Sequence, residues 1–246
     1  MFSILNGQRA DGLHSLLAVK AADIGRNKQE LEKEWIEMPN LKIGRLMLGI
    51  CQTNCYFVYR EGEKEVIFFD PADKGEYIYE ALKEKGFQVA GILLTHGHFD
   101  HIWGTNKLRE LSGAPIYAYE KEKVLCEDAV INVSEQAGRP YTVVPDRYLK
   151  DGEEITVAGM TCKLIATPGH TVGSCCYYFE EDGILISGDT LFQESVGRTD
   201  LATGSMSALV RSVKERLFVL PDEVKVYPGH GEATEIGYEK MHNPFF

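Results

Sequence analysis

The stretch Thr95-His96-Gly97-His98-Phe99-Asp100-His101 carries four potential metal-binding side chains within six residues. It directly follows the apolar run 89–94, a pattern typical of a strand that is buried on both faces. Imidazole nitrogens and a carboxylate oxygen suit a borderline divalent ion such as zinc. The alternative is a histidine-rich surface loop, whose side chains would repel one another once protonated. The stretch therefore predicts a metal site at the end of a buried strand.

Three further turns carry a potential ligand directly after a predicted strand. They contain His170 in Thr167-Pro168-Gly169-His170-Thr171, Asp189 in Ser187-Gly188-Asp189-Thr190, and His230 in Pro228-Gly229-His230-Gly231. Glycine in each turn lets the backbone bend sharply. If the four strand ends converge, they supply five histidines and two aspartates. That set is large enough for two metal ions that share one carboxylate.

From about residue 41 onward, short strands and helices alternate in two successive runs. We expect strands at 43–48, 53–59, 65–70, 89–94, 154–157, 161–166, 175–179, 184–187 and 224–227. We expect helices at 77–85 and 105–111, from near Ser205, and from near Glu232, with a loop-and-helix excursion over 119–148. The helix from Ser205 would place Met206, Leu209, Val210, Val213 and Leu217 on one face. Two such runs predict an α+β fold, in which two packed sheets have helices outside.

Residues 1–36 differ from the remainder and are expected to form a helical extension to a main domain at 37–246. Leu13, Leu16, Leu17, Ala21 and Ile24 recur at helical spacing, and a charged run of good helix formers follows them. The segment carries none of the site chemistry found later in the chain. We therefore expect it to cap one face of the main domain or to pack in a homodimer.

The composition excludes several classes of function. The chain has 246 residues and a net charge of −11, with 26 Lys and Arg against 37 Asp and Glu. This acidic balance argues against nucleic acid or an anionic membrane as the main partner. No apolar run approaches the roughly 18 residues of a membrane-spanning helix, and the start does not resemble a secretory signal. Six cysteines without a C-x-x-C pair indicate reduced thiols and a cytoplasmic protein.

In this order and spacing, THGHFDH, GHT, SGDT and PGH resemble the metal-binding motifs of the metallo-β-lactamase superfamily. The blocks Gln52-Thr53-Asn54-Cys55-Tyr56 and Gly197-Arg198-Thr199-Asp200 resemble its glyoxalase II (hydroxyacylglutathione hydrolase)-like branch. The resemblance covers about residues 41 to 246 and implies an αββα sandwich with metals at one edge. Because only 15 residues follow Gly231, the last glycine of the final motif, we expect no counterpart of the C-terminal helical domain of full-length glyoxalase II. The chain is therefore similar to the single-domain members, and glutathione as the thiol does not follow from the resemblance.

The resemblance also implies a ligand set. One metal would be held by His96, His98 and His170, and the other by Asp100, His101 and His230, with Asp189 bridging the two. Asp70, in Phe69-Asp70-Pro71, would orient a ligand from behind, the role that outer groups commonly play; a turn residue before proline is the alternative. Thr190 is assigned a supporting role beside Asp189. The cofactors expected are two divalent ions, zinc first, with iron or manganese as alternatives.

A metal pair would lower the pKa of a bridging water, and the resulting hydroxide would attack an acyl carbon. Asp100 and Asp189 are the carboxylates assigned to catalysis. A small-molecule thioester such as S-lactoylglutathione suits this site, because a thiolate leaves without being protonated first. Arg198 could pair with a substrate carboxylate through its planar fork, or form a salt bridge with Asp200 that shapes its loop.

The main rival function is a persulfide dioxygenase of the same superfamily, which uses a single iron. His96, His170 and Asp189 would supply its two histidines and one carboxylate. The complete second set of ligands argues for the hydrolase instead. A metal-stabilised binding protein without catalysis is the alternative from a different class.

Overall fold

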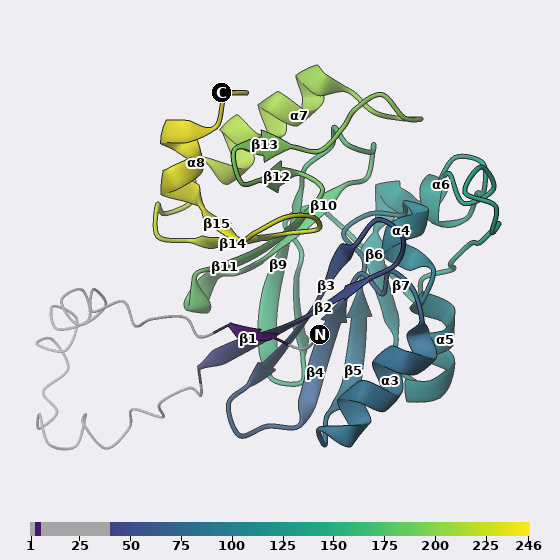
Figure 1. The fold of residues 1–246 in the computed structure, drawn as a ribbon. Coiled ribbons are helices and arrows are strands. Elements are labelled where there is room, and N and C mark those ends of the chain that lie inside the picture. Colours follow the sequence, from purple (N-terminus) through teal and green to yellow (C-terminus); the bar gives the residue numbers. More distant parts are fainter. Residues whose placement is uncertain (1–2, 6–39) are drawn as a thin grey trace, which may run out of the picture.

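Two mixed β-sheets pack face to face with helices on both outer sides (Figure 1). The computed structural model describes residues 3–5 and 40–246. This arrangement confirms the αββα sandwich and the α+β class expected from the sequence. The helices expected between Leu13 and Trp35 lie outside the described residues, and so does most of the 1–36 extension. Ser3–Leu5 is described as a strand that pairs with the first sheet.

The first sheet has the strand order β1-β2-β3-β4-β5-β6-β7. Its strands are β1 (Ser3–Leu5), β2 (Leu41–Leu48), β3 (Thr53–Arg60), β4 (Glu65–Phe69), β5 (Gln88–Leu93), β6 (Ile116–Tyr119) and β7 (Arg147–Leu149). Neighbours are antiparallel from β1 to β4 and parallel from β4 to β7. The parallel strands need crossovers, which the helices α3 (Gly75–Glu84) and α5 (Thr105–Ser112) supply.

The second sheet has the strand order β15-β14-β11-β10-β9-β8. Its strands are β8 (Glu154–Val157), β9 (Met160–Ala166), β10 (Cys175–Phe179), β11 (Ile184–Gly188), β14 (Lys225–Pro228) and β15 (Thr234–Glu235). Only the β11–β14 pair is parallel among the described pairs of this sheet. A short hairpin, β12 (Leu191–Phe192) and β13 (Ser195–Val196), follows β11.

Apolar side chains fill three layers of the sandwich. Between the sheets, Phe69 packs against Tyr177 and Phe179, with ring centroids 5.6 and 6.2 Å apart. Outside the first sheet, Phe57 and Ile78 belong to the layer beneath α3 and α5. Fully burying one such side chain contributes roughly 1.5–3 kcal/mol.

The helix predicted from Ser205 is α7 (Met206–Ser212), which continues as a π-helical turn over Val213–Leu217. The Ser205 side chain caps it by accepting from the main-chain N–H of Ala208 at 3.3 Å. Leu209, Val213 and Leu217 are buried against the second sheet, as expected. Met206, the first residue of the helix, was predicted with them but is 41% exposed and does not belong to this buried layer.

Two segments differ from the sequence prediction. The helix predicted near Glu232 begins only at Ile236, as α8 (Ile236–His242), because Thr234 and Glu235 are extended and pair with β14. The 119–148 excursion does contain helical turns, η2 (Glu120–Glu122) and α6 (Lys123–Cys126), but strands β6 and β7 border it. These strands were missed because such short segments give little periodic signal.

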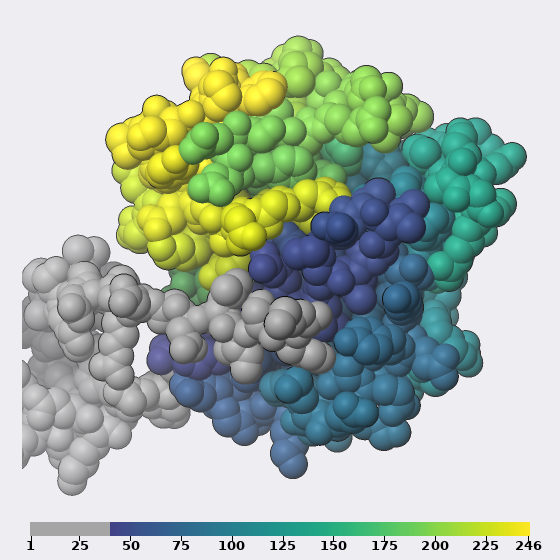
Figure 2. All heavy atoms as spheres, viewed as in Figure 1, coloured from purple at the N-terminus to yellow at the C-terminus, as the bar shows by residue number. Residues whose placement is uncertain are grey.

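Two further features bear on the sequence interpretation. The six cysteines are all free thiols. Within the described residues, no helix is long and apolar enough to cross a membrane. On the molecular surface the segment after β14 lies against the β2–β3 hairpin, which brings the two sheets together at one edge (Figure 2).

Candidate metal centre

The first ligands follow β5, where a buried strand gives way to a turn and then to α4 (Phe99–Ile102). His96 and His98 lie in the turn, and Asp100 and His101 lie on α4. All three histidines are at most 2% exposed. The first main-chain N–H of α4 donates to the carbonyl oxygen of Asn132 at 3.0 Å. The excursion after β6 therefore helps to fix the start of the helix that carries two of the ligands.

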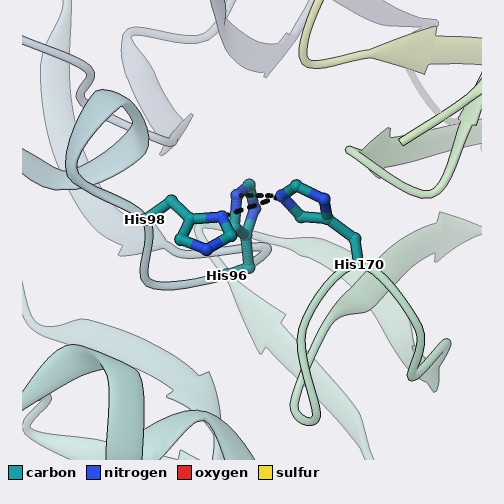
Figure 3. A group of neighbouring side chains, drawn as sticks. All are labelled: His96, His98 and His170. Atoms are coloured by element: carbon teal, nitrogen blue, oxygen red, sulfur yellow. Dashed lines mark hydrogen bonds between the residues drawn. The ribbon is translucent and has the colours of Figure 1, made fainter. Parts of the chain in front are cut away.

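His170 completes a three-histidine group with His96 and His98 (Figure 3). It lies in the turn after β9, so this group joins the first sheet to the second. Nε2 of His170 lies 2.8 Å from Nδ1 of His98 and 3.2 Å from Nε2 of His96. Three ring nitrogens this close can bring their lone pairs to one point. That is the donor set and spacing that a divalent ion requires.

Asp100, His101 and His230 form a second group, whose ligand atoms lie within 4.8 Å of one another. Nε2 of His230 lies 3.4 Å from Oδ2 of Asp100, and Nε2 of His101 lies 3.9 Å from the same oxygen. His230 comes from the turn after β14. This group, too, draws its members from both sheets, and its two imidazoles and one carboxylate suit a second divalent ion.

Asp189 lies between the two groups, in the turn after β11. Its Oδ1 is 3.4 Å from Nε2 of His101, and its Oδ2 is 3.6 Å from Nε2 of His170 and 3.5 Å from Nε2 of His230. The carboxylate is 9% exposed. One side chain thus contacts ligands of both groups, as a bridging carboxylate would.

Three buried atoms at this centre have no hydrogen-bond partner among the described residues. They are Nε2 of His98, Nε2 of His101 and Oδ1 of Asp189. Leaving a buried polar atom unpaired costs about 1–3 kcal/mol, so such atoms are few in native proteins. Two of them, Nε2 of His101 and Oδ1 of Asp189, face each other at 3.4 Å within the centre, whereas His98 faces its group with the other ring nitrogen, Nδ1. An imidazole nitrogen and a carboxylate oxygen are both atom types that bind divalent ions. The side chains present therefore fit a pair of metal ions.

Burial sets the protonation of the three-histidine group. It lowers the pKa of His98 to about 3, and with repulsion from neighbouring rings it holds the pKa of His96 well below the usual range. Burial also lowers the pKa of His170. Desolvation disfavours the charged imidazolium. These imidazoles are therefore neutral at neutral pH, which is the form that binds a metal.

His101 behaves in the opposite way. Burial lowers its pKa, but the carboxylates of Asp189 and Asp100 outweigh burial and raise the pKa well above the usual range. Burial likewise raises the pKa of both carboxyl groups, and attraction to His101 outweighs it, so that each pKa is lowered. In the metal-free protein His101 keeps a proton among carboxylates. A metal ion in the second group would displace that proton.

Asp70 holds the turn that carries the ligands. Its Oδ1 accepts from the main-chain N–H of Thr95 at 2.8 Å, and its Oδ2 accepts from the Thr95 hydroxyl at 2.6 Å. The same Oδ2 lies 3.0 Å from Nδ1 of His101. The structure thus places Asp70 where an orienting carboxylate would lie. Its φ of 48° shows that it also makes the sharp turn at the end of β4.

The two other supporting residues lie farther from the ligand atoms. The Thr190 hydroxyl is 2.8 Å from the Thr167 hydroxyl, so it connects the turn of Asp189 to that of His170. The Arg198 side chain is 62% exposed and forms two 2.7 Å hydrogen bonds to Asp200. Its main-chain carbonyl oxygen lies 2.6 Å from Nδ1 of His170. Arg198 therefore contacts a ligand through its backbone.

Two residues of the site have roles that the sequence reasoning did not give them. Asn54 donates through its side chain to the carbonyl oxygens of Pro228 and Gly231, on either side of His230. It belongs to the quoted Gln52–Tyr56 block, which was the available signal. Glu122 is buried beneath the three-histidine group and accepts from Gly97 and Thr171. It lies in the excursion after β6, where no motif marked it.

Comparison with known proteins agrees with this geometry. A family model described as the metallo-beta-lactamase superfamily matches residues 48–230. The probable metallo-hydrolase YqgX of Bacillus subtilis is 38% identical over 207 residues, which span 83% of this chain and 97% of that protein. The hydroxyacylglutathione hydrolase GloC of Haemophilus influenzae is 33% identical over 198 residues, which span 79% of this chain and 92% of that protein.

Two solved structures share the fold at similar identity. The BLEG-1 B3 metallo-beta-lactamase superposes with a TM-score of 0.79 at 39% identity, over 82% of this chain and 98% of that one. A protein solved in a di-iron-bound form, TTHA1623, superposes with a TM-score of 0.72 at 35% identity, over 82% of this chain and 99% of that one.

Proposed function

This chain belongs to the metallo-β-lactamase superfamily, and we propose that it is a two-metal hydrolase that cleaves thioesters such as S-lactoylglutathione. The observation that supports a metal pair is the position of Asp189, whose oxygens lie 3.4–3.6 Å from ring nitrogens of both ligand groups. The relative solved with two irons supports the same stoichiometry. The relative GloC, a hydroxyacylglutathione hydrolase, supports the substrate class.

Bound divalent ions lower the pKa of a coordinated water toward about 7 and stabilise negative charge on an acyl oxygen. His96, His98 and His170 would hold one ion, and Asp100, His101 and His230 the other, with Asp189 between them. Zinc is the first expectation for both ions, and iron or manganese the alternatives.

The chain's own groups support this chemistry. The carboxylates of Asp100 and Asp189, with their lowered pKa values, stay negative at neutral pH and offset the positive charge of the ions. Asp70 fixes the His101 ring from the nitrogen that faces away from the centre. A thiolate, with a pKa around 8.5, leaves an acyl group without a proton donor. None of the ligand histidines is therefore needed as a proton donor, and all of them can bind metal.

The test is hydrolysis of S-lactoylglutathione by the purified protein, with the metal content measured on the same sample. We expect turnover with about two metals per chain, and loss of both in Asp189→Ala. Activity and metal content that survive in Asp189→Ala would show that the two-metal site is wrong. If two metals are bound but S-lactoylglutathione is not hydrolysed, the two-metal hydrolase site stands and this thioester is excluded as the substrate.

Two other reactions serve as comparisons in the same assay. One of the similar structures is a B3 metallo-beta-lactamase, so a chromogenic cephalosporin is included as a substrate. His96, His170 and Asp189 are the candidate ligands of a single iron, and His170 Nε2 lies 3.2 Å from His96 Nε2 and 3.6 Å from Asp189 Oδ2. If the protein holds one iron per chain and consumes oxygen when glutathione persulfide is added, the proposed function would be a dioxygenase instead of a hydrolase.

A further inference from the structure

We propose that Glu122 is a positioning residue that sets the spacing between the two loops of the three-histidine group. The inference rests on the proposed two-metal site and adds to it a residue that selectively supports one of the two ions. Glu122 is 1% exposed and lies where η2 passes into α6, between the His96–His98 turn and the His170 turn. Among the described residues, its carboxylate accepts hydrogen bonds from both of these turns.

The carboxylate joins the two turns directly. Its Oε1 accepts from the main-chain N–H of Gly97 at 2.7 Å, and Oε2 accepts from the Thr171 hydroxyl at 2.8 Å. The main-chain N–H of Gly173 is a third donor to it. Gly97 stands between the first two ligand histidines, and Thr171 follows the third. One side chain therefore ties together the backbone segments from which all three imidazoles project.

The surrounding packing leaves little freedom for a different arrangement. A Cβ atom on Gly97 would lie 2.9 Å from Cβ of Leu125, in α6. A Cβ atom on Gly173 would overlap the main-chain nitrogen of Glu122. Both turns thus rest directly on the backbone of the η2–α6 segment, and glycine is needed for that approach. The segment acts as a spacer, and its carboxylate fixes each turn against it.

Glu239 provides a comparison within the same chain. It is also fully buried and accepts from Thr234, Asn243 and the main-chain N–H of Glu194. None of these donors adjoins a metal-ligating residue. Burying a carboxylate is unfavourable unless hydrogen bonds compensate for the lost hydration. At Glu239 the compensating bonds connect α8 to a hairpin, whereas at Glu122 they connect the loops of the three-histidine group.

Loss of the Glu122 carboxylate should therefore act on one metal site. Without it, the Gly97 N–H and the Thr171 hydroxyl lose their shared acceptor. The 2.8 Å and 3.2 Å spacings of His170 to His98 and His96 would then no longer be fixed from behind. The second group keeps its support, because Asp70 holds His101.

The experiment measures zinc affinity rather than activity. Metal-free wild type, Glu122→Ala, Glu122→Gln and Glu239→Gln are titrated with Zn²⁺ against a chromophoric chelator, with circular dichroism as a check of folding. We expect Glu122→Ala to weaken one of two sites by about 10–100-fold, the usual effect of removing a group that supports a ligand. Glu239→Gln should retain both affinities even if it melts earlier.

Glu122→Gln should give a smaller effect, because its oxygen still accepts one bond while its amide nitrogen meets the donor N–H groups. Glu122→Gln also tests the inference if Glu122→Ala does not fold. His98→Ala weakens the three-histidine site directly and so identifies which zinc affinity belongs to it. Adding Glu122→Gln to His98→Ala should then cause little further loss of zinc affinity. Wild-type affinities in the Glu122 variants, or equal weakening of both sites, would overturn the inference. A wild type that binds a single zinc would instead contradict the two-metal proposal.

Discussion

The side-chain amide of Asn54 spans the turn that carries His230. Its nitrogen lies 3.0 Å from the carbonyl oxygen of Pro228 and 2.9 Å from that of Gly231. The main-chain N–H of Asn54 also donates to the carbonyl oxygen of Gly229 at 2.7 Å. The start of β3 therefore fixes a ligand turn that lies more than 170 residues later in the chain. This explains why a block without catalytic groups accompanies the metal motifs.

We predict that Asn54→Ala destabilises the protein and weakens the second metal site. Removal of the amide leaves the carbonyl oxygen of Gly231 without its donor, whereas that of Pro228 keeps the Tyr56 hydroxyl at 3.1 Å. Asn54 is only 2% exposed. An unsatisfied buried group costs about 1–3 kcal/mol. Thermal unfolding of the metal-free protein and a zinc titration measure the two effects. Asn106→Ala is the control, since it removes an exposed amide hydrogen bond to Thr142. Equal effects of the two variants would contradict the prediction.

Gly229 is required because the metal centre lies against its Cα atom. A Cβ atom there would overlap Oδ1 of Asp189 and lie 2.7 Å from Cε1 of His101. We predict that Gly229→Ala retains the fold but loses metal from the second group, since the methyl group occupies ligand space. Metal content measured by mass spectrometry checks this result.

Gly231, on the other side of His230, is the matched control. It has a φ of 78°, but open space surrounds the position of a Cβ atom. Gly231→Ala should therefore cost roughly 1 kcal/mol of stability through backbone strain while both metals remain. Retention of two metals in Gly229→Ala would show that the centre tolerates the methyl group and that the prediction is wrong.

The ligand turns could be predicted from the sequence because each is local. A ligand residue, a neighbouring glycine and a preceding apolar strand all lie within about ten residues, a span over which periodicity is informative. The strands on which these turns stand, such as Gln88–Leu93 and Ile184–Gly188, are found within one residue of the prediction.

Asp70 and Thr190 were assigned supporting roles through the family resemblance, but the roles of two other supporting residues could not be found from the sequence. Asn54 and Glu122 act through contacts 174 and 25 residues away along the chain. Such contacts leave no periodic signal, because tertiary packing alone brings the partners together. The short strand Thr234–Glu235 was not predicted for the same reason, because only its pairing with β14 makes this segment extended.

Arg198 is expected to have little influence on substrate binding. Its guanidinium already makes both bonds of a fork-like pair with Asp200, and the pair is exposed. Its contact with the site runs through the carbonyl oxygen that faces His170, which alanine preserves. We predict that kcat and KM of Arg198→Ala stay within about twofold of wild type. A raised KM with unchanged kcat would instead assign the side chain to a substrate carboxylate.

The stability of the metal-free protein should depend on pH through Glu122. Burial raises the pKa of this carboxyl from 4.5 to about 7, even though hydrogen bonds from Gly97, Thr171 and Gly173 oppose the change. The other titratable groups that sense it are the thiols of Cys126 and Cys175, whose pKa values burial raises well above the usual range. Those thiols stay neutral, so the carboxyl itself dominates the titration of this pocket.

The sign of the effect follows from proton binding. Between pH 4.5 and about 7 the folded protein keeps the Glu122 proton, whereas the unfolded chain has lost it. Stability therefore falls as pH rises through this window, by up to about 1.4 kcal/mol per pH unit, and levels off above it. Glu122→Gln cannot titrate at this position. The difference between its melting temperature and that of the wild type should therefore shift in favour of the variant as pH rises from 5 to 7. Melting curves of both metal-free proteins at half-unit pH steps measure the difference, and parallel pH dependences would show that Glu122 is already ionised at pH 5.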